Sequence, residues 1–140
     1  MKDFLDGVLE NDLYRPMYNY FKKRNYSIEF EVPIHCNRID LVAYNQIHLI
    51  AVELKLKNWH RALRQATYYQ LGADFSYIAM PFYQAVEVYK RGRFLKCEGV
   101  GLFGVILNKD EVRELIKPKR SIKKLDYMAR GIYLTIRRRR

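Results

Sequence analysis

Hydrophobic residues recur at three- and four-residue steps near the start of the chain, from Leu5 to Phe21. This spacing predicts an amphipathic helix over about residues 2–23. Pro16 lies inside that range, and a proline is harmless in the first turn of a helix but removes a hydrogen bond further along. One kinked helix and two helices meeting near Asn11 or Asp12 are therefore both open.

After residue 25 the pattern changes to short runs that are typical of β-strands. Three runs follow one another and are expected to form an antiparallel meander: 27–34, 38–44 and 47–57. The third is too long for an ordinary strand, so its charged end is expected to lead into a helix. Asn58 suits the N-cap of that helix, which covers about residues 59–71 and ends at Gly72.

The second half of the chain alternates between the two patterns. It predicts a strand at 77–80, a helix at 82–91 and a glycine-spaced buried strand at 99–107. Residues 111–117 suit a helix or the second strand of a hairpin, and the turn residues before them favour the hairpin. Residues 132–136 are expected to form an edge strand.

Composition places the chain among packed single domains, because its 140 residues are 49% hydrophobic and 29% charged. No apolar run approaches the roughly 18 residues that span a bilayer, and no secretion signal is visible. Cys36 and Cys97 offer at most one disulfide and no metal-ligand spacing. These features predict a cytoplasmic protein with no membrane partner, no disulfide scaffold and no structural zinc.

The positive charge is concentrated at one end of the chain. Residues 109–140 hold twelve Lys and Arg against four acids and carry +8 of the net +11. Such a segment suits a polyanion, with nucleic acid the natural candidate, although a solubilising tail or one that docks on an acidic protein or anionic membrane also fits. Its basic residues are the expected phosphate-backbone contacts: Lys119, Arg120, Lys123, Lys124, Arg137, Arg138, Arg139 and Arg140.

Three ionisable residues lie inside the apolar strands: Asp40, Glu53 and Lys55. A buried charge is costly unless it is paired, hydrated or bound to a metal, so each needs a reason. Glu53 and Lys55 are two residues apart and share a face of their strand. The simplest alternative is a surface-facing strand on which the three residues form cross-strand ion pairs.

The turn between the second and third strands decides whether Asp40 shares that face. A two-residue turn at Asn45-Gln46 places Asp40 opposite Ala51, so that Asp40 and Glu53 are diagonal neighbours with Cβ atoms roughly 7–8 Å apart. A four-residue loop keeps the same faces, whereas a three-residue loop reverses them. Two carboxylates and the backbone carbonyl of Leu54 would suit Mg²⁺ or Mn²⁺.

The following helix adds polar groups next to this strand. Gln65 and Tyr69 are four residues apart and face one side, with Arg61 and Arg64 nearby. A helix that starts directly after Lys55 can lie beside the carboxylates and contact a bound phosphate. Gln65 and Tyr69 could equally be ordinary half-buried helix residues.

These residues resemble the PD-(D/E)XK nuclease superfamily, whose restriction-endonuclease-like fold also occurs in Holliday junction resolvases. The resemblance covers about residues 10–106 and rests on three motifs and the αβββαβ order: Arg38-Ile39-Asp40-Leu41-Val42, Glu53-Leu54-Lys55 and Gln65-Ala66-Thr67-Tyr68-Tyr69. Ile39 stands where the proline that names the motif is expected. The resemblance implies an α/β fold with a central mixed sheet flanked by helices, with residues 1–118 as the nuclease-like domain and residues 119–140 as a basic C-terminal extension.

The resemblance also implies a role for each site residue. Asp40 and Glu53 would bind Mg²⁺, with Mn²⁺ as an alternative, Lys55 would position the attacking water, and Gln65 would assist beside the site. Family members often add an acid from the first helix, for which Glu10 is the first choice, with Asp12 and Glu31 as alternatives. Arg61, Arg64 and Tyr69 would contact nucleic acid.

The expected function is therefore Mg²⁺-dependent endonuclease activity on DNA, with a homodimer as one way to cut both strands. Three alternatives stay open: a non-catalytic nucleic-acid-binding module, an RNA-directed nuclease, and a nuclease fold whose tail binds a partner protein. The His and Cys residues lack repeated ligand spacing, and the glycines at 99–104 lack the residues that follow a phosphate-binding loop.

Overall fold

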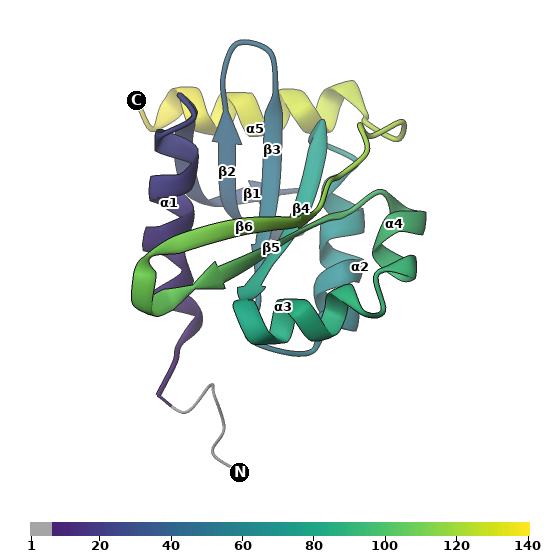
Figure 1. Ribbon diagram of the computed structural model, residues 1–140. Coiled ribbons are helices and arrows are strands. Elements are labelled where there is room, and N and C mark those ends of the chain that lie inside the picture. The colour runs from purple at the N-terminus through teal and green to yellow at the C-terminus, as the bar shows by residue number, and fades with distance from the viewer. Residues whose placement is uncertain (1–6) are drawn as a thin grey trace.

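A six-stranded mixed sheet forms the centre of the computed structural model, which describes residues 7–140 (Figure 1). The strands lie side by side in chain order: β1 (Ser27–Ile34), β2 (Asn37–Tyr44), β3 (Leu49–Leu54), β4 (Phe75–Pro81), β5 (Gly101–Ile106) and β6 (Glu111–Ile116). β1, β2 and β3 form an antiparallel meander, β3, β4 and β5 run parallel, and β6 returns antiparallel to β5. The predicted α/β class, with a mixed sheet flanked by helices, is confirmed.

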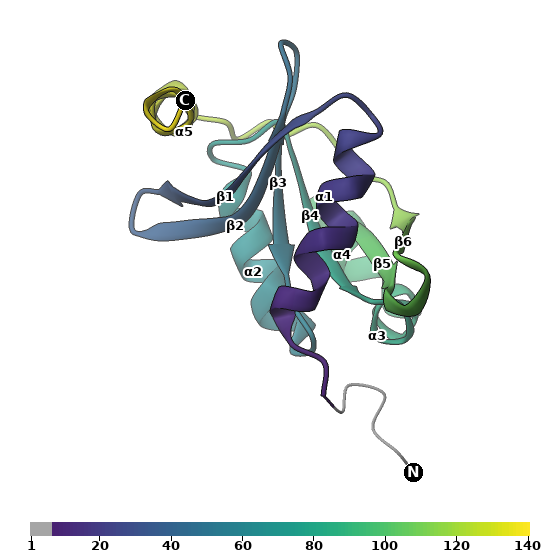
Figure 2. The ribbon, with the colours of Figure 1, turned by 90° about the vertical axis from the view of Figure 1, so that its left-hand side faces the viewer.

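Helices cover both faces of this sheet. The helical elements are η1 (Glu10–Leu13, 3-10), α1 (Tyr14–Lys22), α2 (Trp59–Tyr69), α3 (Phe82–Tyr89), α4 (Arg93–Glu98), η2 (Leu107–Lys109, 3-10) and α5 (Asp126–Arg138). Figure 2 shows α1 on one side of the sheet and α2 and α5 on the other. Within residues 7–140 no helix is long and apolar enough to cross a membrane.

Each face is closed by a helix whose apolar residues form one stripe. Buried residues recur every four positions, with Leu13 at the end of η1 and Met17 and Phe21 on α1, and they pack against β2, β3 and β5. On α2 the fully buried residues Ala62 and Ala66 have short side chains, which lets this helix lie close to the sheet.

The first predicted helix is divided in two. Residues 7–9 form no helix, η1 follows, and α1 begins at Tyr14 with Pro16 in its first turn, where a proline is harmless. The predicted residues 2–6 lie outside the described part of the chain. Asn58 does occupy the N-cap of α2, but it adopts a left-handed conformation with φ of 61° and makes no side-chain cap hydrogen bond.

The prediction of an edge strand at 132–136 is wrong, because this segment belongs to α5. Met128, Ile132 and Ile136 recur every four residues and are buried against β1, β2 and α2, so the apolar residues of this segment follow the period of a helix and not that of a strand. The predicted helix at 82–91 ends at Tyr89, and the sequence analysis missed α4. The strands at 27–34 and 111–117 match β1 and β6 closely.

Candidate active site

The β2–β3 hairpin sets the relation between the two carboxylates. Of the turn lengths left open, the four-residue loop is present, and the side-chain oxygen of Asn45 accepts hydrogen bonds from the backbone N–H groups of Ile47 and His48 at 2.8 and 2.7 Å. The longer loop shifts the register by two residues and keeps the faces unchanged. Asp40 therefore lies level with Glu53, and the two share one face of the sheet.

Regular strand pairing stops on both sides of Asp40. Towards β3, the ladder ends at Leu41 opposite Val52, and the backbone N–H of Leu54 donates to Asp40 Oδ2 at 2.8 Å in place of a backbone carbonyl. Towards β1, Glu31 has a φ of 51° and interrupts the pairing. Backbone pairing between β2 and β3 thus ends next to Asp40, where the strands separate.

Glu53 is 4% exposed and is held from the side of α2. The hydroxyl of Tyr69 lies 2.6 Å from Glu53 Oε1 and 2.9 Å from the backbone carbonyl oxygen of Arg38. A hydroxyl carries one proton, so Tyr69 donates to one of these acceptors at a time when Glu53 is ionised. The Glu53 side chain is also hydrogen-bonded to that of Asp40, so a proton on Glu53 is donated to the Asp40 carboxylate.

The environment opposes two negative charges at this place. Burial, reinforced by the charge of Asp40, raises the pKa of Glu53 to about 8. Burial also raises the pKa of Asp40, while the N–H of Leu54 and the charge of Lys55 act in the opposite direction. The pair therefore holds a proton near neutral pH or needs a cation to be fully ionised.

The start of the first helical segment adds further groups. The charge of Glu10, in η1, raises the pKa of Asp40. Tyr14 has its pKa raised to about 12 by burial and by Asp40, Glu31, Glu53 and Glu10. Sequence analysis did not single out Tyr14, because its contact with the site depends on how α1 crosses the sheet.

Of the three acids proposed to complete the site, Glu10 acts most directly on Asp40. Asp12 is used elsewhere, since its carboxylate accepts a hydrogen bond from the N–H of Leu9 at 2.8 Å. Glu31 lies on the far side of Asp40, in the interrupted part of β1, and its charge acts on Tyr14. The choice of Glu10 as the third acid stays a prediction, since among residues 7–140 no three acids are grouped so as to hold a metal.

The backbone of β3 turns a further oxygen towards the same gap. Lys55 N donates to the carbonyl of Ala79 on β4 at 3.0 Å. The N–H and C=O of a strand residue point to the same side and alternate from one residue to the next, so the Leu54 carbonyl faces β2, as its N–H does. Asp40, Glu53 and this carbonyl form a set of oxygen donors that suits Mg²⁺. Within residues 7–140, no cluster of three or more His, Cys, Asp or Glu side chains is arranged to bind a metal.

Gln65 lies one helical turn before Tyr69. Because β3 and β4 are parallel, α2 runs back against β3, and one turn of about 5.4 Å along α2 matches two residues along β3. Gln65 is therefore placed level with Lys55, as Tyr69 is with Glu53. The Oε1 atom of Gln65 is buried and has no hydrogen-bond partner in the described chain.

The predicted nucleic-acid contacts form two groups, one on α2 and one after position 118. Arg61 and Arg64 are exposed on α2, near the carboxylates. Tyr69 is 1% exposed and contacts Glu53, so it has little surface for nucleic acid.

Several basic residues after position 118 bind the protein itself. Lys124 and Arg120 reach the buried carboxylate of Asp74 at 2.6 and 3.4 Å. Arg139 donates to the carbonyls of Phe30 and Glu31 at 2.6 and 2.9 Å. The remaining ones are Lys123, paired with Glu98 at 3.8 Å, Arg140, above the Tyr44 ring, and the exposed Lys119, Arg137 and Arg138.

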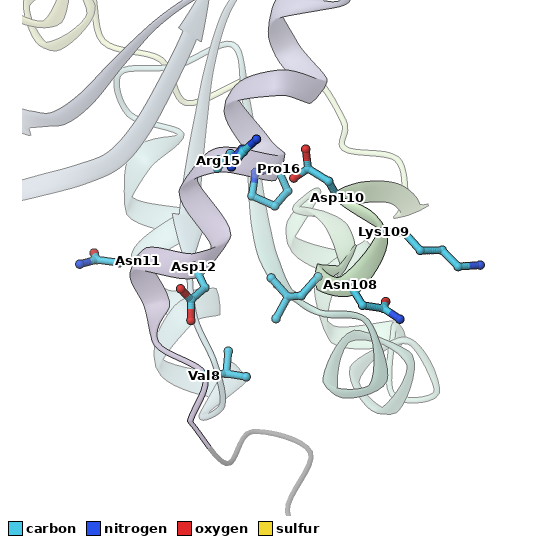
Figure 3. A pocket seen from close by; sticks show the side chains of 9 residues that line it. Val8, Asn11, Asp12, Arg15, Pro16, Asn108, Lys109 and Asp110 are labelled. Atoms are coloured by element: carbon cyan, nitrogen blue, oxygen red, sulfur yellow. The ribbon is translucent and has the colours of Figure 1, made fainter.

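A hollow of about 700 Å³ lies between the start of α1 and the β5–β6 turn (Figure 3). Asp12, Arg15, Lys109 and Asp110 contribute both signs of charge to its lining. Asp110 accepts a hydrogen bond from Asn19 at 2.9 Å. The carboxylate pair does not line this hollow, so the two are separate features.

The fold is similar to that of the SPO1766 protein of unknown function from Silicibacter pomeroyi. The TM-score is 0.67 at 13% sequence identity, and the match covers 91% of this chain and 85% of that chain. No protein-family model matches the chain, and no curated protein matches it. Likeness at this identity concerns the fold alone, so function must be argued from the site.

Proposed function

We propose that the protein is a metal-dependent nuclease that hydrolyses phosphodiester bonds in DNA on a restriction-endonuclease-like αβββαβ core. One observation carries the proposal: Asp40 and Glu53 form a buried carboxylate pair where β2 and β3 separate, and the pKa of Glu53 is raised to about 8. A site of this kind either holds a proton or shares a cation. A divalent cation lets both carboxylates stay ionised at neutral pH.

The donor set suits Mg²⁺, with Mn²⁺ as an alternative, since all its ligands are oxygen atoms. Asp40, Glu53 and the Leu54 carbonyl would hold the ion, which when bound supplies polarisation of a phosphate oxygen and a lower pKa for a water. Asp40 is oriented for this role because Leu54 N–H fixes one of its oxygens, while its side chain is also hydrogen-bonded to Glu53. Tyr69 fixes Glu53 from the opposite side.

Lys55 and Gln65 act on the substrate in this proposal. Lys55 follows Glu53 by two residues on the same face, so its ammonium would orient the attacking water and offset charge that develops on the phosphate. Gln65 offers an unpartnered amide oxygen level with Lys55. Arg61 and Arg64, exposed on the same helix, would bind the neighbouring phosphates.

A non-catalytic nucleic-acid-binding module on the same fold is the second candidate. It is favoured by one observation: within residues 7–140 no group of three or more metal-ligating side chains is present. In that case the proton shared by the pair, and not a metal, would satisfy the buried carboxylates. This candidate predicts binding without metal-dependent cleavage.

Cleavage assays distinguish the metal-dependent nuclease from the non-catalytic binding module. Supercoiled plasmid, branched DNA, single-stranded DNA and RNA are incubated with Mg²⁺, Mn²⁺ or EDTA, and wild type is compared with Glu53→Ala, Asp40→Asn and Lys55→Ala. Glu111→Gln is the matched control, because Glu111 is exposed on β6 and pairs with Arg113. Metal-dependent cutting that all three site variants lose and the control keeps supports the nuclease, and the preferred substrate decides between DNA and RNA. Equal cutting by wild type and the site variants rules it out.

A further inference from the structure

A groove of about 400 Å³ opens beside the start of α2, between this helix and α3. Trp59, Met80 and Val86 line its apolar side, and Lys57 and Arg91 lie at its margin. Its volume falls within the range of sites for small organic groups, and such sites combine apolar walls with a few polar groups. The groove therefore has the size and lining for one flat ring.

One polar side chain that lines the groove has an unsatisfied oxygen atom. Gln84 lines it, and the Oε1 atom of Gln84 is buried without a hydrogen-bond partner in the described chain. A buried amide that lacks a partner is destabilising unless a bound group supplies one. A side-chain amide both donates and accepts, which matches the edges of nucleobases.

Aromatic rings continue from the groove onto the surface. The Trp59 ring stacks on His60 with centroids 3.7 Å apart and lies 5.9 Å from Phe94, which is 56% exposed. Rings of this kind are the usual platforms for unpaired bases, whatever their sequence.

The charge around the groove favours an anionic partner. Between residues 55 and 98 the chain has eight Lys and Arg residues. The two exposed acids of this stretch, Glu87 and Glu98, each pair with a lysine. Glu87, which also lines the groove, is thus neutralised, whereas Lys57 and Arg91 line the groove and form no ion pair within the described part of the chain.

We infer that this groove binds an unpaired nucleobase of the nucleic acid, next to the phosphate held at the carboxylate pair. The inference rests on the proposed function for that phosphate. Trp59 follows Lys55 by four residues, a reach of at most about 14 Å, or about four nucleotide steps of 3.4 Å. Bases inside a duplex are stacked and cannot enter the groove, so the substrate class is nucleic acid with a single-stranded or unpaired nucleotide close to the cleaved bond.

Binding in EDTA tests the inference without requiring cleavage. The probes are a short fluorescein-labelled blunt duplex, the same duplex with one extra unpaired thymine, and the corresponding single strand, followed by fluorescence anisotropy. Wild type is expected to prefer the two probes with unpaired bases. Trp59→Ala should weaken binding to those probes by about 5- to 100-fold and leave the blunt duplex unchanged.

Two further variants guard against a folding defect, because Trp59 is partly packed in the core. Trp59→Phe keeps a ring and should keep most of the preference. Gln84→Leu keeps the packing and should lower it by about 2- to 10-fold. Tyr127→Ala, which removes a 62% exposed ring from α5, is the matched control and should change nothing.

Any of three results overturns the inference: equal affinity of wild type for all three probes, no binding at all, or a preference that survives both Trp59→Ala and Gln84→Leu. The proposed function fails separately. If these variants abolish the preference and the protein cuts no substrate, the base-binding groove is supported and the nuclease activity is ruled out.

Discussion

The carboxylate pair predicts an unusual dependence of stability on pH. A carboxyl whose pKa is raised by folding stabilises the folded state fully below its unfolded pKa, and this contribution is lost as pH rises through the folded pKa. For Glu53 the window runs from about 4.5 to about 8. Most surface acids behave in the opposite way, so the direction of the change identifies the buried pair.

The size of the effect follows from the rise in pKa. At 1.36 kcal/mol for each pKa unit, the change from 4.5 to about 8 lowers the free energy of unfolding by about 3 kcal/mol at pH 7 and about 5 kcal/mol at pH 9, relative to acid solution. Glu53→Gln removes the titrating group while keeping its size, and its amide can still bond to Tyr69. The variant is therefore expected to lack this loss and to be more stable than wild type above neutral pH.

Urea unfolding followed by circular dichroism, in EDTA between about pH 5 and pH 9, measures the difference directly. A saturating concentration of Mg²⁺ should remove the alkaline loss in wild type, because a cation bound by the pair favours its ionised form, and should leave Glu53→Gln unchanged. Parallel pH profiles for the two proteins in EDTA would refute the reasoning. A normal profile that Mg²⁺ does not alter would refute the metal site as well.

Four other predictions follow from particular contacts. Tyr69→Phe removes the hydrogen bond that lowers the pKa of Glu53, so the midpoint of the stability loss should move to higher pH in the same unfolding experiment. Asp74→Ala leaves the N–H of Leu49 unsatisfied and should lower the free energy of unfolding by about 2–4 kcal/mol, measured with urea. The Lys124 bond lowers the pKa of Asp74, so wild type should lose the stabilisation by Asp74 only as pH falls through that pKa. Gly101→Ala would place a Cβ atom 2.5 Å from the Tyr77 ring, which stacks on a neighbouring ring, and should cost about 1–3 kcal/mol by the same measurement. Replacing Arg61 and Arg64 by Gln should reduce the slope of log affinity for duplex DNA against log salt by about two, measured by anisotropy, and an unchanged slope would remove them from the interface.

The strands and the shared face of the carboxylates could be predicted because both depend on short-range patterns. Alternation of apolar and polar residues determines where β1 and β2 run. The pattern left a two-residue and a four-residue turn open, and because both keep every side chain on its face, Asp40 and Glu53 meet across the four-residue turn that is present.

The rest depends on packing between distant segments. The hydroxyl of Tyr69 reaches Glu53 only because Ala62 and Ala66 let α2 lie close to the sheet. The bond between Lys124 and Asp74 joins positions 50 residues apart, so no local sequence pattern predicts it. Residues 132–136 look like a strand in isolation, and only the four-residue spacing that includes Met128 reveals the helix.

The separation of β2 and β3 gathers Asp40, Glu53, Lys55, Gln65 and Tyr69 from one continuous stretch of chain, between a tight turn at His35-Cys36 and the turn that follows α2. The turn at His35-Cys36 is exposed, as are the sites where chains best tolerate breakage and joining, whereas the turn after α2 is buried at Gln70, Ala73 and Asp74 and must be kept in any exchange. A genetic exchange that begins in the first turn and keeps the second would carry all five groups together with the hairpin and helix that orient them. The constellation can thus be inherited as a unit, while the helices and strands around it change independently.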